Sequence, residues 1–212
     1  MATAPSRVTL ASGLTLSCVE HGGDPAGPTV VLLPGPTDSW RSYGPVLDRL
    51  PASVHAVAAS QRGHGDSDKP PTGYAVEDFA ADVPLLLDAL GIERAVLVGH
   101  SGSCLVARRV AIDHPGRVAG LVLEASPVTL EADPGLTAFV QSVVSQLRDP
   151  MDPGFVRNFV VDTSAGGLAP ELLDHLVADV LTCRRTCGGR PSRGCSGATT
   201  SGSSPASTPR PS

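Results

Sequence analysis

Residues 95–111 constrain the fold of this chain more than any other stretch. Residues 95–98 are all apolar and predict a buried strand, and apolar residues recur at helical spacing after Ser103, which predicts a helix. Between them lies Gly99-His100-Ser101-Gly102-Ser103, a small-x-Ser-x-small pattern. A serine on a sharp strand-to-helix turn takes a strained backbone conformation, and only small residues fit two positions before and after it. The pattern predicts that Ser101 stands clear at the end of the strand as a nucleophile.

The Gly102 amide is the second chemical group that this turn supplies. As the first amide of the predicted helix it faces outward at the positive end of the helix dipole, where it can stabilise an anion. The alternative is that Ser101 merely caps the helix N-terminus. The strand before the serine and the helix after it favour the nucleophile interpretation.

Composition excludes several classes of function. The chain has 212 residues, 41% of them hydrophobic, and a net charge of −5. This acidic balance, without a cluster of lysine and arginine, argues against nucleic acid and membrane surfaces as partners. The N-terminus has no apolar core of signal-peptide length, so we expect a cytoplasmic protein. Cys18 and Cys104 lie in apolar elements, and we expect no disulfide framework, no metal site and no cofactor.

The remaining patterns predict an α/β fold. Residues 7–10 and 14–19 alternate around a Ser-Gly turn, as an antiparallel hairpin does. Apolar runs predict further strands at 29–33, 54–59 and 117–124, and helical periodicity predicts helices at 40–50 and 74–90. Strands that alternate with helices build a mostly parallel sheet with helices on both faces.

These features together resemble the α/β-hydrolase fold family. The matching motifs are the turn at 99–103, the Arg-Gly-His-Gly-Asp-Ser turn at 62–67, the loop ending in Asp38-Ser39-Trp40, and His-Pro at 114–115 before the sixth strand. The resemblance covers residues 8–180 and implies a core over 1–126 and a helical cap over 127–181. It also implies that the last strands of the fold are missing from residues 182–212.

In this family the residue type of the nucleophile decides the chemistry. Haloalkane dehalogenases and epoxide hydrolases of the family carry aspartate where this chain has Ser101. A serine implies a small-molecule substrate attacked at an acyl carbon, either of an ester, thioester or lactone or of the ketone of a carbon–carbon hydrolase, through an acyl-enzyme. The alternative is a non-catalytic relative that binds a small apolar ligand.

The loop after the third strand departs from the family pattern. The second oxyanion donor is usually the amide of the residue after His-Gly, and Pro36 stands at that position without an N–H. Either Thr37 supplies the hydrogen bond through its amide or hydroxyl, or the site is impaired. A further alternative is that the two prolines of this loop only stiffen it.

A second departure concerns the general base and its carboxylate. In this family the acid and histidine follow the seventh and eighth strands, and none of the six histidines here follows a late strand. His64 is a weak candidate for the base, and Glu124 comes one residue too early to serve as the acid. The resemblance therefore implies an incomplete triad.

The cap predicted for residues 127–181 contains three helical segments, at 135–148, 153–161 and 170–181. In the family such a cap covers the substrate pocket, although apolar cap residues pack more often than they touch substrate. We expect His100, Trp40 and Phe139 to contact the substrate.

The composition changes abruptly after Leu181. Residues 183–212 contain no large apolar side chain and cannot form a core. We interpret this tail as a frameshifted reading, because a two-base shift of GC-rich codons over 182–209 allows an amphipathic helical sequence. The alternative is a genuine disordered tail.

Sequencing the gene from codon 180 onward tests this interpretation. We expect the shifted frame to stay open and to encode a strand ending in aspartate and, later, a Gly-His turn. If that frame closes at once, the tail is genuine and Ser101 belongs to a divergent, non-catalytic relative.

Overall fold

The computed structural model describes residues 4–23, 27–127, 134–142, 150–164 and 166–183. Six strands form one sheet in the order β1-β2-β4-β3-β5-β6. They are β1 (Ser6–Thr9), β2 (Thr15–His21), β3 (Thr29–Leu33), β4 (His55–Ala59), β5 (Ala95–His100) and β6 (Val118–Glu124). The β1–β2 and β2–β4 pairs are antiparallel, and β4, β3, β5 and β6 run parallel. The predicted hairpin and mostly parallel sheet are confirmed.

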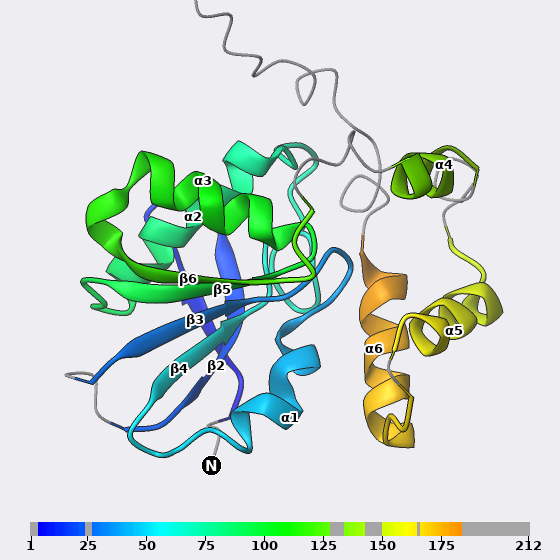
Figure 1. Cartoon of the computed structure of the whole chain (residues 1–212), viewed down its shortest axis with the longest axis horizontal. Coiled ribbons are helices and arrows are strands. Elements are labelled where there is room, and N and C mark those ends of the chain that lie inside the picture. Colours follow the sequence, from blue (N-terminus) through cyan, green and yellow to red (C-terminus); the bar gives the residue numbers. More distant parts are fainter. Residues whose placement is uncertain (1–3, 24–26, 128–133, 143–149, 165, 184–212) are drawn as a thin grey trace, which may run out of the picture.

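Helices cover both faces of the sheet (Figure 1). On one face lie α2 (Val76–Ala89) and α3 (Ser103–Asp113), and on the other lie the 3₁₀ turn η1 (Trp40–Tyr43) and α1 (Gly44–Leu47). Successive residues of a strand point to opposite faces, so β3 sends Val31 and Leu33 toward α2 and α3 but Leu32 toward α1. The central strands are therefore buried on both sides, which explains why their sequences are continuously apolar.

The helix predicted at 40–50 is broken into η1 and α1. Pro45 is the reason, because it lacks the N–H that an α-helix starting at Trp40 would need at this position. The chain instead makes a 3₁₀ turn, in which the Gly44 N–H donates to the Arg41 carbonyl, and α1 restarts with Pro45 in its first turn.

Three helices follow the sheet and lie together on one side of it (Figure 1). These are α4 (Pro134–Ser142), α5 (Pro153–Asp162) and α6 (Pro170–Thr182), close to the predicted segments. Buried apolar residues of α5 and α6 form a cluster of their own, made by Val156, Val160, Leu176, Val177 and Val180. The tail is predicted to begin at residue 182, but Thr182 is the last residue of α6 and Cys183 is 6% exposed, so the packed part of the chain extends two residues further. Residues 184–212 of the predicted tail lie outside the described residues. In the described part no helix is long and apolar enough to cross a membrane.

Strand β6 is the edge of the sheet in the part of the chain that the structure describes. It pairs with β5 on one side, and its apolar residues Leu121, Val122 and Leu123 are 38–45% exposed. It carries no lysine, proline or internal charge of the kind that protects edge strands from pairing with another chain. An exposed apolar edge of this length favours self-association.

We therefore expect the isolated chain to self-associate through β6, and Val122→Lys to reduce this association because a lysine on an edge strand opposes edge-to-edge pairing. Light scattering coupled to gel filtration across a range of concentrations measures the effect. Val161→Lys is the matched control, since Val161 is equally exposed but lies on α5. A wild-type chain that stays monomeric and unfolds cooperatively would contradict this expectation.

Candidate active site

The turn between β5 and α3 has the backbone geometry of a nucleophile elbow. Ser101 has a φ of 53°, in the left-handed region that L-residues rarely occupy. Its N–H donates to the Glu124 carbonyl at 2.8 Å, and its own carbonyl accepts from the Cys104 N–H at 3.0 Å. A Cβ atom on Gly99 would lie 2.6 Å from the Ser103 carbonyl oxygen, so only glycine fits there.

Strained backbone in the described residues is concentrated around this turn. Only three residues other than glycine have positive φ there: Thr37, Ser101 and Ala125. They follow β3, β5 and β6, three adjacent parallel strands, and so lie together at the carboxyl edge of the sheet. Each such conformation costs about 1–3 kcal/mol and persists mainly at functional sites. This is also the edge at which open α/β sheets bind ligands.

The loop after β3 forms a tight turn over residues 35–38. The Asp38 N–H donates to the Gly35 carbonyl at 3.1 Å, with Pro36 and Thr37 as the central residues. Thr37 has a φ of 73°, as the third position of a type II turn requires, although a β-branched residue is strained there. Pro36 packs directly on the elbow, because a Cβ on Gly102 would come within 2.9 Å of its Cγ.

Two backbone amides at this junction have no hydrogen-bond partner among the described residues. They are the N–H groups of Gly102 and Thr37. Buried or half-buried amides are nearly always paired in proteins, so two free donors on segments in contact indicate a place for an anion or a polar ligand. The sequence identified both residues, but it did not show that the turn is left-handed at Thr37.

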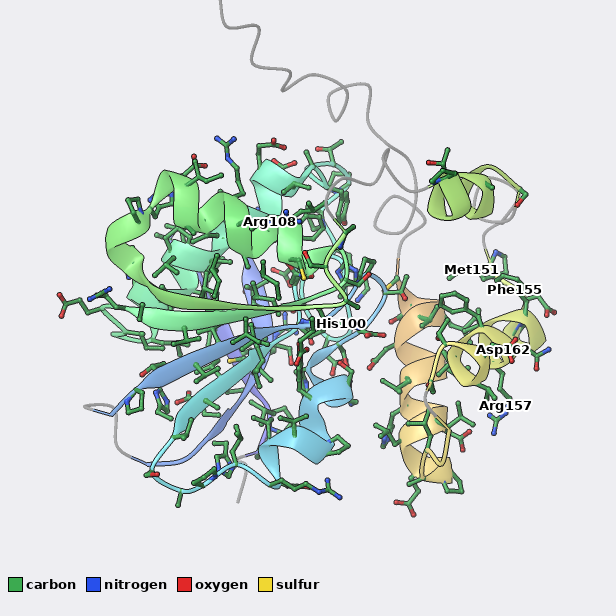
Figure 2. All side chains as sticks on the ribbon, in the orientation of Figure 1. His100, Arg108, Met151, Phe155, Arg157 and Asp162 are labelled. Atoms are coloured by element: carbon green, nitrogen blue, oxygen red, sulfur yellow. The ribbon has the colours of Figure 1, made fainter. Side chains whose placement is uncertain are left out.

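The predicted substrate contacts have different environments. The ring of His100 packs against Gly35, where an added Cβ would lie 2.7 Å from Nδ1, and Figure 2 places it at the end of the sheet nearest α6. Trp40 packs on the core cluster beneath η1, with the Arg41 guanidinium 4.9 Å from its ring centre. The side chain of Phe139 lies outside the described residues. The structure brings His100 to the elbow, and the roles of all three stay predictions.

No histidine forms a carboxylate pair at the elbow in the described residues, which include all six histidines of the sequence. His55 pairs with Glu20 at 3.3 Å, but it opens β4 at the opposite end of the sheet. His114 is the C-cap residue of α3, and His175 is exposed on α6. Glu124 accepts a hydrogen bond from the Tyr43 hydroxyl at 3.0 Å, on the α1 side of the sheet.

His64 serves the structure of its own turn. Its Nδ1 donates to the Arg62 carbonyl at 2.8 Å, and burial lowers the pKa of its imidazole, so it is neutral. Arg62 donates to both carboxylate oxygens of Asp82 at 2.6 Å and to the Gly73 carbonyl. These contacts give the 62–67 turn a structural role.

A half-buried carboxyl, Asp38, lies beside these groups and was not recognised as a candidate from the sequence. Burial and, second, the negative charge of Asp179 raise the pKa of Asp38 to about 7. Its Oδ2 lies 3.4 Å from the position that a Gly35 Cβ would take, the same point that the His100 ring covers. Asp38 thus titrates near neutral pH within reach of the elbow.

The described residues contain no cluster of side chains that could hold a metal ion.

The raised pKa of Asp38 predicts a pH dependence of stability. The folded chain holds this proton more tightly than the unfolded chain, in which an aspartate has a pKa of about 3.9. The free energy of unfolding should therefore fall as the pH rises from about 4 to about 7, and Asp38→Asn should remove that part of the slope. Urea unfolding across this range tests it, with the exposed Asp162→Asn as control. Equal slopes for wild type and Asp38→Asn would contradict the assignment.

Comparisons with known proteins agree with this geometry. The model of the family described as alpha/beta hydrolase fold matches residues 28–165. A non-heme chloroperoxidase of Streptomyces lividans is 36% identical over 132 residues, which cover 61% of this chain and 47% of that protein. A 2-(acetamidomethylene)succinate hydrolase of Mesorhizobium japonicum is 36% identical over 51% of this chain and 38% of its own length. Epoxide hydrolase A of Mycobacterium tuberculosis is 35% identical over 60% of this chain and 40% of its own length.

Solved structures show the same fold. A hydrolase from Pseudomonas aeruginosa superimposes with a TM-score of 0.71 at 22% identity, over 86% of this chain and 68% of that one. An esterase from Exiguobacterium antarcticum superimposes with a TM-score of 0.66 at 18% identity, over 86% of this chain and 70% of that one. The chain spans less than half the length of the three curated relatives. With the family model matching well over half of its residues, the chain belongs to the α/β-hydrolase fold family.

Proposed function

We propose that this chain derives from a serine hydrolase in which Ser101 attacks the acyl carbon of a small ester, lactone, thioester or related acyl substrate, including the ketone of a carbon–carbon hydrolase. The observation that carries the proposal is the strained Ser101 at the carboxyl edge of the sheet, beside two unpaired amides. A half-buried serine held in the left-handed region costs free energy, which a turn with only a structural role would avoid by using glycine.

The proposed reaction has two steps. Ser101 Oγ bonds to the acyl carbon as its proton passes to a base, and the carbonyl π electrons move to the oxygen. The tetrahedral oxyanion then collapses and expels the alcohol, thiol or carbon leaving group, which takes up a proton. Water repeats the attack on the acyl-enzyme, releases the acid and returns Ser101 to its initial state.

The two unpaired amides would stabilise the oxyanion. Gly102 N–H is the donor expected next to the nucleophile, and we assign Thr37 N–H as the second because Pro36 has none. The left-handed φ of Thr37 supports this role, since the turn leaves that amide without an internal partner. Losing one oxyanion donor typically costs on the order of a hundred- to a thousand-fold in turnover.

The described residues place no histidine–carboxylate pair at the elbow, which is the general base that the family uses. A serine without a histidine is weakly nucleophilic at neutral pH, and a positioned base typically contributes a rate factor of about 10²–10⁴. We therefore propose that the chain is impaired, with slow turnover from the nucleophile and oxyanion donors alone. Residual catalysis of this kind is known when a triad is incomplete.

Two of the three relatives compared above are named as hydrolases, which supports hydrolytic chemistry in general. Epoxide hydrolases of this fold use aspartate as the nucleophile, so Ser101 points to acyl substrates instead. Within that class we propose that His100, Trp40 and Phe139 contact the substrate from the strand end, η1 and α4.

A second candidate is a non-catalytic protein that binds a small apolar ligand at the same edge of the sheet. The observation in its favour is that no histidine–carboxylate pair lies at the elbow among the described residues. Such a protein would keep the fold and the unpaired amides without turning a substrate over.

Rescue with imidazole tests the proposal. If only the base is lacking, added imidazole should raise the rate of p-nitrophenyl acetate hydrolysis by wild type at least about tenfold over the protein-free reaction with imidazole. Ser101→Ala should show no rate above that background. The measurement is the initial rate of p-nitrophenol release against imidazole concentration.

The control variant is Ser12→Ala, which removes an exposed serine from the β1–β2 turn and should behave like wild type. Equal rates for wild type and Ser101→Ala at every imidazole concentration would exclude the serine hydrolase. Retained binding of the ester under those conditions would then support the second candidate.

A further inference from the structure

A carboxylate of α6 is buried against the core at the loop that carries Thr37. Asp179, in the last turn of α6, is 6% exposed. It accepts a hydrogen bond from the Ser39 hydroxyl, and its Oδ1 lies 3.1 Å from Arg41 Nη1. A buried carboxylate is costly unless it is paired and hydrogen-bonded, and here both partners come from the core.

The two partners of Asp179 are themselves fixed to the core. Ser39 is fully buried, and its hydroxyl accepts the Arg41 N–H at 3.1 Å while it donates to Asp179. Arg41 also reaches Asp66 through Nη2 at 3.0 Å. Asp179 therefore joins α6 to η1 and, through Arg41, to the 62–67 turn.

The same end of α6 makes a second contact with this loop. The Cys183 thiol, just after the helix, lies 3.5 Å from the Thr37 carbonyl oxygen. Asp179 and Cys183 thus contact both ends of the segment from Thr37 to Arg41. The carbonyl of Thr37 is held on the α6 side, while its N–H has no partner among the described residues.

The conformation of Thr37 needs such support. A β-branched residue at a φ of 73° is strained, and strain persists only where the surroundings determine the conformation. We propose that Asp179 is a positioning residue that holds the 37–41 segment, through Ser39 and Arg41, and so keeps the Thr37 amide beside the Gly102 amide. Its effect on catalysis rests on the proposed function, but its effect on the loop does not.

The negative charge of Asp179 provides a second measurement, the pKa of Asp38, which a change in packing alone would not alter. The groups that interact with its carboxylate are Arg41, Asp38 and His64. Replacing Asp179 with asparagine keeps its size and one acceptor oxygen but removes the negative charge. The pKa of Asp38 should then fall from about 7 toward its ordinary value, although burial keeps it raised.

Hydrogen exchange of the full chain tests the position of the loop. Asp179→Asn should speed exchange at the Asp38 and Arg41 amides, which bond to Gly35 and Ser39, by about tenfold or more because the segment opens more often. Arg41→Gln should have the same effect from the core side. The double variant should exchange little faster than either single variant, because each of the three variants breaks the same ion pair between Asp179 and Arg41.

Asp174→Asn is the matched control. Asp174 lies on the same helix and pairs with Arg157 of α5 at 2.7 Å, so its loss removes a charge from α6 without touching the core loop. It should leave exchange over residues 35–41 and the titration of Asp38 unchanged. Carbon-13 NMR of the Asp38 carboxyl measures the titration in each variant.

The imidazole-rescued, Ser101-dependent rate separates this inference from the proposed function. If wild type shows that rate, Asp179→Asn should lower kcat on the order of tenfold to a hundredfold with little change in KM. If wild type shows none, the proposed function fails, and the exchange and titration results still decide the inference. Exchange and Asp38 titration in Asp179→Asn that match Asp174→Asn would overturn it.

Discussion

The close approach of Gly99 to the backbone of α3 is the constraint on which this site depends. A side chain at that position would meet backbone atoms of residues 103 and 104, so the helix can start directly against the strand only because glycine is there. Ser101, in the tight turn between the two, lies in the left-handed region at the carboxyl edge of the sheet. The hydrogen bond from Ser101 N–H to the Glu124 carbonyl then ties the strained turn to β6.

The strain at the elbow is matched by strain in the loop after β3. Both segments bend sharply where their strands end, and Pro36 of one packs on Gly102 of the other. One buried carboxylate from α6 supports the second bend through Ser39 and Arg41. The helical segment after the sheet is thus coupled to the backbone amide that we assign to the oxyanion, rather than serving only as a cover.

Much of this arrangement was predictable from the sequence because it is local. Strand runs, the hairpin turn and the small-x-Ser-x-small pattern depend on neighbours in sequence, and each appears in the structure near its predicted position. The break after Tyr43 was missed because apolar periodicity outweighed Pro45, although proline is a local signal that could have placed it.

The contacts that the sequence could not reveal join residues far apart in the chain. Asp179 on an amphipathic helix is typical of a solvent-facing position, and only the fold shows that it is buried against Ser39, 140 residues earlier. The raised pKa of Asp38 follows from the same distant charge and from burial. The positive φ of Thr37 was equally hidden, because threonine is among the residues least expected in that conformation.

A crystal structure of the chain with phenylboronic acid bound to Ser101 tests the central claim most directly. A boronate bonded to the serine oxygen mimics the tetrahedral intermediate and places one oxygen where the oxyanion would form. The account predicts that this oxygen lies about 2.7–3.1 Å from both the Gly102 and the Thr37 amide nitrogens. An adduct whose oxygens meet only solvent, or a Thr37 N–H that faces away from the boronate, would contradict it.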